Sequence, residues 1–266
     1  MTKSIRVLTV FVFAFILTSC ANNPNQNRYS SQNTANNINN YHAVPQANPV
    51  LDGLLQKANQ GDVTAQNKLG VMYADGKGVA KNATEAEKWF RLAANQGDAA
   101  AQTNLGAMEE SKQNNTEAMS WYSKSAKQGY ALGQTNLAKM YLDKKNYTEA
   151  AKWFRKSADQ GYADAQIMLG GMYFEGHGVK KDYVTAYKFF SLAAAKGNKK
   201  AEEAMVLLQN KMTKSQLEIV CDLKENALVT IFSSRNMGPT PCNMLAIEKD
   251  VHKVVDETVE KEKRKH

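Results

Sequence analysis

Residues 61–98 read GDVTAQNKLGVMYADGKGVAKNATEAEKWFRLAANQGD, and this stretch decides the fold because the chain repeats its pattern three more times. Each copy opens at a glycine that follows a glutamine: Gly61, Gly97, Gly129 and Gly161, with Gly197 closing the last copy. The intervals between these glycines are 36, 32, 32 and 36 residues. Self-similarity at this period predicts a stacked helical array, in which each copy buries its apolar face against its neighbours.

Each copy contains the pattern of two helices. In the first half of the first copy, Ala65, Leu69, Gly70 and Tyr73 are spaced so that they share one face of an α-helix. The second half reads Ala-x-x-Trp-Phe-x-x-Ala-Ala at residues 86–94, and it recurs with small changes in the other copies. Aromatic side chains between small ones predict a second helix that packs antiparallel to the first.

Capping residues mark the ends of the predicted second helices. Asn82, Asn114 and Asn146 each stand three residues before a glutamate, and Asp182 takes this place in the fourth copy. Such residues accept hydrogen bonds from the free N–H groups of a first helical turn. The glycine that closes each copy predicts a left-handed residue at the end of the second helix.

Taken together, these residues resemble the Sel1-like repeats, which are relatives of tetratricopeptide repeats. The marks of the family are Ala-x-x-x-Leu-Gly-x-x-Tyr, then Gly-x-Gly-Val, then Ala-x-x-Trp-Phe-x-x-Ala-Ala-x-x-Gly, and the first and fourth copies match nearly throughout. The middle copies lack the Gly-x-Gly-Val loop; Glu109 replaces the expected tyrosine and Ala138 the expected glycine. The resemblance covers roughly residues 51–211 and implies an all-α fold, a solenoid of about four stacked helix pairs.

The resemblance and the composition divide the chain into four segments. Residues 1–19 are expected to be a lipoprotein signal peptide, and residues 20–49 a lipidated cysteine with a disordered, asparagine-rich tether. Residues 50–212 hold the solenoid. Residues 213–266 are expected to form a helical cap, in which Thr213 and Gln216 are placed to cap a helix. The amphipathic segment 245–259 is expected to dock on the last repeat, although dimerisation and partner binding remain open for it.

The first twenty residues predict delivery to a membrane. Lys3 and Arg6 precede an apolar run at residues 7–17, which is too short to span a bilayer and fits a signal peptide. The run ends in Leu-Thr-Ser-Cys, which resembles the bacterial lipobox and implies lipidation of Cys20. An ordinary secretory cleavage site is the alternative. Because Ala21 follows the cysteine, analogy with enteric sorting implies the outer membrane, with the array facing the periplasm or the cell surface.

The remaining cysteines and the net charge indicate which covalent links and which partners can be expected. With Cys20 lipidated, Cys221 and Cys242 are expected to form a disulfide in an oxidising periplasm, worth about 3 kcal/mol in the chain-entropy model. Two unrelated buried thiols are the alternative. The net charge of +8 is too diffuse to indicate a nucleic-acid partner. The basic stretch at 261–265 fits a solvated helix end, or else contact with anionic lipid headgroups.

Side chains suited to catalysis or metal binding are sparse. None of the four histidines has another histidine or cysteine at metal-ligand spacing, so we expect no metal, cofactor or enzyme activity. His177 is expected in an exposed turn, and the Gly-x-Gly turns follow no strand that would support phosphate binding. Cysteine-rich Sel1-like proteins have been described as penicillin-binding with weak β-lactamase activity. This chain has no Ser-x-x-Lys, which leaves hydrolysis of a β-lactam a minor alternative.

A binding function is therefore expected, with the first helices lining the concave side of the array. By analogy with tetratricopeptide repeats, the exposed positions lie two residues before and after each motif leucine: Asn67, Val71, Thr103, Ala107, Thr135, Lys139, Ile167 and Gly171. This set suits an extended peptide or a partner helix, and a merely solvated face is the alternative. The prediction is a membrane-anchored scaffold or adaptor that binds protein or peptide partners; binding of cell-wall fragments is the second possibility. The tryptophans of the repeats are expected in the core.

Overall fold

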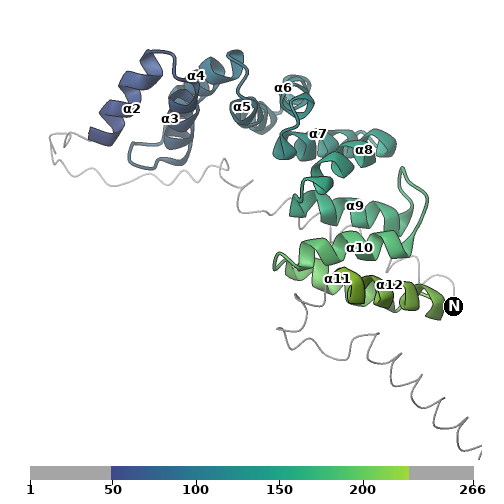
Figure 1. Ribbon diagram of the computed structural model, residues 1–266. Coiled ribbons are helices and arrows are strands. Elements are labelled where there is room, and N and C mark those ends of the chain that lie inside the picture. Colours follow the sequence, from purple (N-terminus) through teal and green to yellow (C-terminus); the bar gives the residue numbers. More distant parts are fainter. Residues whose placement is uncertain (1–48, 228–266) are drawn as a thin grey trace, which may run out of the picture. The chain divides into compact units, whose positions relative to one another are not determined.

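The computed structural model describes residues 49–227, with side chains up to residue 221 (Figure 1). The predicted signal peptide, Cys20, most of the tether, Cys242 and the segment 245–259 lie outside these residues. Cys221 is disulfide-bonded. The predicted pairing of Cys221 with Cys242 stays a prediction, because Cys242 lies outside the described residues. No helix of the described part is long and apolar enough to cross a membrane.

The described residues are helical and divide into two compact parts, the first ending at Ala165 and the second beginning at Gln166. The first part holds consecutive helices that pack as pairs, which confirms the predicted fold class (Figure 1). They are α2 (Pro49–Asn59), α3 (Val63–Asp75), α4 (Ala83–Asn95), α5 (Ala99–Ser111), α6 (Asn115–Lys127), α7 (Ala131–Asp143) and α8 (Tyr147–Asp159). In each full copy the odd-numbered helix is the first and the even-numbered helix the second.

The second compact part continues the same pattern. Helix α9 (Ala163–Glu175) begins just before it, and α10 (Tyr183–Ala194), α11 (Lys199–Gln209) and α12 (Lys214–Ala227) follow. Helix α10 packs against both α11 and α12. Thr213 Oγ1 accepts from the Gln216 N–H at 3.3 Å, and Gln216 Oε1 accepts from the Thr213 N–H at 3.0 Å. This reciprocal pair confirms the predicted cap.

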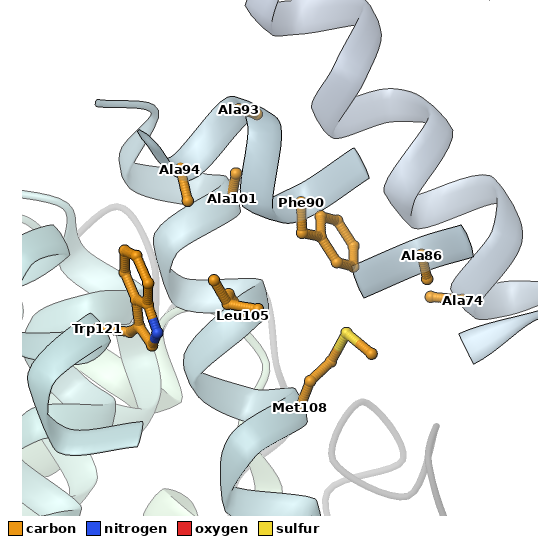
Figure 2. Close-up of a cluster of buried hydrophobic side chains, with 9 residues drawn as sticks. All are labelled: Ala74, Ala86, Phe90, Ala93, Ala94, Ala101, Leu105, Met108 and Trp121. Atoms are coloured by element: carbon orange, nitrogen blue, oxygen red, sulfur yellow. The ribbon is translucent and has the colours of Figure 1, made fainter. Parts of the chain in front are cut away.

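The core consists of the motif residues that the repeat pattern singles out. Leu69, Leu105 and Leu137 are at most 1% exposed, and so are the aromatic side chains Phe90, Tyr122 and Phe154. Figure 2 shows one cluster, where Phe90 and Trp121 lie among the alanines and Leu105 of α3 to α5. Trp153 departs from the prediction, because it is only partly buried against the next cluster, that of Tyr122 and Leu137.

The predicted N-cap residues accept hydrogen bonds from the first turns of their helices, with one exception. Asn82 and Asn146 accept backbone N–H groups of the first turns of α4 and α8, and Asp182 does the same for α10. Asn114 occupies the N-cap position of α6 but makes no side-chain cap hydrogen bond. Its amide donates instead to Glu109 Oε2 at 2.8 Å, because the glutamate that replaces the motif tyrosine draws the side chain away from the helix end.

Left-handed residues end the helices where the repeat predicts them. The five glycines that open or close a copy have φ between 82° and 95°. Where the middle copies lack the Gly-x-Gly-Val loop, Gln113 and Lys145 take up left-handed conformations with φ of 66° and 58°. Side chains other than glycine adopt this region at a cost of about 1–2 kcal/mol, so each shortened turn stores some backbone strain.

Candidate functional site: the concave surface of the first compact part

The first helices lie on the inner side of the curve in the first compact part. Helix α5 packs against both α3 and α7, whereas the approach of successive second helices, α4 to α6 and α6 to α8, is weaker. When one row of helices lies closer together than the other, the stack curves toward that row. Helices α3, α5 and α7 therefore form the concave side, as expected.

Three of the residues predicted to be exposed on this side are buried. Thr103, Thr135 and Ile167 are 2%, 0% and 4% exposed, so the prediction of a solvent-facing position was wrong for them. Gly171 is buried as well. Ile167 belongs to α9, whose sequence ADAQIMLGGMYFE is apolar on nearly every side, and a helix of this kind is buried.

The two threonines are buried because their hydroxyl groups bond across to the second helix. Thr103 Oγ1 lies 2.7 Å from Ser125 Oγ, and Thr135 Oγ1 lies 2.8 Å from Ser157 Oγ. Ser125 Oγ also lies 2.7 Å from the Ala99 carbonyl oxygen, and Ser157 Oγ lies 2.8 Å from that of Ala131. A buried hydroxyl needs such partners. The threonines thus join two helices and are not accessible to a partner molecule.

The residue after each threonine faces the concave side instead. Asn104 and Asn136 are partly exposed, and Asn104 Nδ2 donates to Asn67 Oδ1 at 3.2 Å. Val71 is 36% exposed. Ala107 and Lys139, which were also predicted, are partly exposed and lie one helical turn after Asn104 and Asn136. We name this set the concave asparagine surface: Asn67, Val71, Asn104, Ala107, Asn136 and Lys139.

Asn104 and Asn136 were not among the predicted residues, although the sequence holds a signal for them. The tetrapeptide Gln-Thr-Asn-Leu stands at 102–105 and again, unchanged, at 134–137. Identical polar residues at one position of neighbouring copies indicate a shared environment. By analogy with tetratricopeptide repeats, the position two residues before the motif leucine was expected to be exposed. In the second and third copies the exposed position is one residue later, which on a helix is a rotation of about 100°.

Buried glutamines hold the first helices in place beneath this surface. Gln66, Gln102 and Gln134 donate to the carbonyls of Ala58, Ala94 and Ala126 in the preceding second helix, at 3.0–3.2 Å. Each also accepts from the glutamine before the next copy, at 2.7–2.8 Å; these donors are Gln96, Gln128 and Gln160. The three acceptors are 4–5% exposed. The resulting ladder joins each copy to its neighbour and keeps the concave surface rigid.

We expect Gln102→Ala to lower the free energy of unfolding by about 0.5–1.5 kcal/mol, because the substitution removes the buried hydrogen bond to the Ala94 carbonyl, which keeps only backbone donors such as the Gly97 N–H. The matched control is Gln128→Ala, which removes the exposed end of the same pair and should cost a few tenths of a kcal/mol. Urea denaturation of the two variants beside the wild type measures the difference. Equal losses in both variants would mean that burial of the ladder does not matter.

A buried carboxylate lies between α4, α5 and α6. Glu109 is 2% exposed, accepts from Asn114, and contacts Lys112 Nζ at 3.1 Å. Lys112 also contacts Glu87 at 2.7 Å, which in turn pairs with Arg91 at 2.8 Å. The Asn114 amide lowers the pKa of Glu109 below its ordinary value; burial opposes this effect and Lys112 adds to it. A carboxylate held ionised in this way is a structural anion and a weak proton acceptor.

The stability of this network should depend on pH. A carboxyl group with a lowered pKa in the folded state contributes stability above its unfolded pKa, near 4.3 for a glutamate, and this contribution is lost as the pH falls through the folded value. We therefore expect Glu109→Gln to lose less unfolding free energy than the wild type between neutral and strongly acidic pH. Urea midpoints at both pH values measure this, with Glu85→Gln as the control for the loss of one partly exposed carboxylate. Parallel pH profiles for the wild type and Glu109→Gln would contradict it.

No catalytic arrangement emerges from the rest of the described residues. Among them, no group of three histidine, cysteine, aspartate or glutamate side chains is placed to hold a metal ion. His177 is half-buried in its turn, where an exposed position was expected, and its N–H donates to the Met172 carbonyl at 3.0 Å. Its environment is that of a turn residue bound to the end of α9.

Comparison with known proteins agrees with this geometry. The family described as Sel1 repeat matches residues 63–98, 99–130, 131–162 and 163–198. A solved structure with the SLR fold, described as a protective antigen of uropathogenic Escherichia coli, is 32% identical with a TM-score of 0.63, covering 73% of this chain and 45% of that one. A Sel1 repeat protein from Oxalobacter formigenes is 35% identical with a TM-score of 0.55, covering 59% and 48%. This chain spans about half the length of either. A comparison with curated proteins found no match.

Proposed function

The chain belongs to the Sel1 repeat family, whose members mediate protein–protein interaction, and we propose that it is a scaffold or adaptor that binds a protein or peptide partner through the concave asparagine surface. The observation that carries the proposal is the row formed by Asn67, Asn104 and Asn136 on neighbouring first helices. The bound segment is extended, and the repeats arrange partners without chemical turnover.

The side chains of the surface suit a peptide backbone. Each asparagine amide offers donors and an acceptor, and an extended peptide presents an N–H and a carbonyl at every residue. The small Ala107 and the half-exposed Val71 leave room for a backbone to approach. Neighbouring helices lie about 10 Å apart and an extended chain rises about 3.3 Å per residue, so each copy would bind about three residues.

The test is affinity purification of partners from membranes with two matched double variants. Asn104→Arg with Asn136→Arg places bulk and charge on the concave asparagine surface. Ser120→Arg with Thr148→Arg makes the same change at exposed positions of α6 and α8. We expect the first variant to lose the partners that the wild type retains and the control to keep them. Partners unchanged by the concave substitutions would contradict the proposal.

We further propose that the protein is anchored to the outer membrane by lipid at Cys20, with the array facing the periplasm or the cell surface. The charged start, the apolar run and the Leu-Thr-Ser-Cys end of residues 1–20 support this. The likeness to a structure described as a protective antigen fits exposure outside the cytoplasm. Two acyl chains or more bind a membrane stably without a spanning helix. Cys20→Ser should move the protein from the membrane to the soluble fraction, and retention in the membrane would refute the anchor.

A further inference from the structure

The outer side of α6 and α8 carries basic residues that find few carboxylate partners. Residues 113–160 hold eight lysine and arginine residues against four aspartate and glutamate residues, whereas residues 61–112 hold six against seven. The basic side chains of α4 and α5 are paired, Lys88 with Glu85 and both Arg91 and Lys112 with Glu87. By contrast, Lys124, Lys127 and Lys156 are exposed and form no ion pair with another described residue.

These lysines have a repeated position on the outer surface. Lys124 Nζ lies 3.7 Å from the ring centre of Trp121, and Lys156 Nζ lies 4.4 Å from that of Trp153. Lys127 follows Lys124 by one turn, and Lys152 precedes Lys156 by one turn in an exposed pair with Glu149 at 3.4 Å, a kind of pair that contributes little. We name this set the outer basic surface: Lys124, Lys127, Lys152 and Lys156.

In the first copy, an apolar residue stands at the position that Lys124 and Lys156 occupy in the second and third copies. Leu92 follows Trp89 by three residues, as Lys124 follows Trp121 and Lys156 follows Trp153, and it is 42% exposed. The convex side of a curved stack meets a plane over a limited stretch, and here that stretch carries lysines beside an exposed leucine. Unpaired ammonium groups complement a negatively charged plane, and a leucine beside them suits the boundary between headgroups and acyl chains.

We propose that the outer basic surface docks the repeat array on an anionic phospholipid membrane. This surface lies on the second helices, whereas the concave asparagine surface lies on the first helices, so docking leaves the first helices open to a partner. The attraction is electrostatic and therefore weakens as salt rises. Each lysine near such a surface strengthens binding about fivefold, so the four together contribute on the order of several hundredfold.

The test is sedimentation with vesicles of phosphatidylcholine, with and without phosphatidylglycerol, using the chain from residue 20 onward with Cys20→Ser so that no lipid anchor contributes. One variant replaces Lys124, Lys127, Lys152 and Lys156 by glutamine. The matched control replaces the four basic residues at the end of the chain by glutamine: Lys261, Lys263, Arg264 and Lys265. Circular dichroism confirms that both are folded.

We expect binding to the anionic vesicles alone, a loss on the order of several hundredfold in the first variant, and near wild-type binding in the control. Asn104→Arg with Asn136→Arg should bind these vesicles at least as well as the wild type, which separates this proposal from that of partner binding. Equal binding to neutral vesicles, no binding at low salt, or a loss confined to the control variant would each overturn the proposal.

Discussion

Replacing Phe90 by alanine is expected to lower the free energy of unfolding by about 3–5 kcal/mol, the range typical of large aromatic truncations in a core. Phe90 is 1% exposed and belongs to a buried cluster that also holds Leu105, Met108 and Trp121 and spans helices α4, α5 and α6 (Figure 2). Its loss leaves a cavity at the junction of two copies. Equilibrium unfolding in urea, followed by circular dichroism, measures the change.

The control for this substitution lies two residues further along the same helix. Leu92 is 42% exposed, and Leu92→Ala should change the free energy of unfolding by no more than about 0.5 kcal/mol. Because both substitutions shorten an apolar side chain in α4, a difference between them isolates burial. If Phe90→Ala were as mild as Leu92→Ala, the packing between copies would not depend on the aromatic residue of the motif.

The second large effect is expected at the motif glycine of α3. Three ring carbons of Phe90 lie 2.9 Å or closer to where a β-carbon on Gly70 would sit, so Gly70→Ala should destabilise the protein by about 1–3 kcal/mol. For Gly53 in α2, no atom other than those of its chain neighbours and its own helix backbone lies within 4 Å of the β-carbon position. There the same substitution should stabilise by about 0.5–1 kcal/mol, because alanine is the better helix former. The two changes are chemically identical, and their opposite signs should be visible in urea midpoints.

A double-mutant cycle identifies the cause of the loss at Gly70. In a Phe90→Leu background the aromatic ring that the new methyl group meets is gone, so Gly70→Ala should cost much less than in the wild type. Additive effects of the two substitutions would contradict close approach to Phe90 as the reason for the glycine. The third copy already carries Ala138 at this position, fully buried, which shows that the stack can accommodate a methyl group where the neighbouring packing differs.

The fold could be predicted because its causes are local and repeated. Gly97, Gly129 and Gly161 end helices by their left-handed φ, and Asn82 and Asn146 cap helices through their own side chains. Each of these effects acts within one turn of the residue that causes it. Four copies of the same pattern then leave one arrangement in which every apolar face is covered.

The candidate site could be predicted only in part, because it depends on which way each first helix is rotated. Thr103 and Asn104 are both polar, and neither their type nor their spacing from Leu105 decides which one faces solvent. Ser125 decides it, since its hydroxyl pairs with that of Thr103 at 2.7 Å from a different helix. Serine occurs at this position only in the two copies that carry the threonine, whereas the first and fourth copies have Ala93 and Ala193. Such a correlation is evident only once the two helices are seen in contact.

The role of the buried carboxylate of Glu109 could not be predicted either, because it too depends on contacts with other helices. Glu109 was visible as a departure from the motif, but its partners come from outside its own helix. Arg91 lies on α4, Lys112 follows the end of α5, and Asn114 stands at the N-cap position of α6. An isolated buried charge is costly, so the substitution of tyrosine by glutamate requires this whole set of partners. The middle of the array is consequently held together by more polar contacts than the motif alone indicates.

Site-specific photocrosslinking in cells tests most directly whether the concave asparagine surface binds a partner. A photoreactive amino acid is placed at Asn104 or Asn136 on the concave side, and at Ser120 or Thr148 on the second helices as controls. We predict that both concave positions form covalent adducts with the same protein and that the control positions do not. Adducts with a protein partner from Ser120 or Thr148, and none from Asn104 or Asn136, would contradict it.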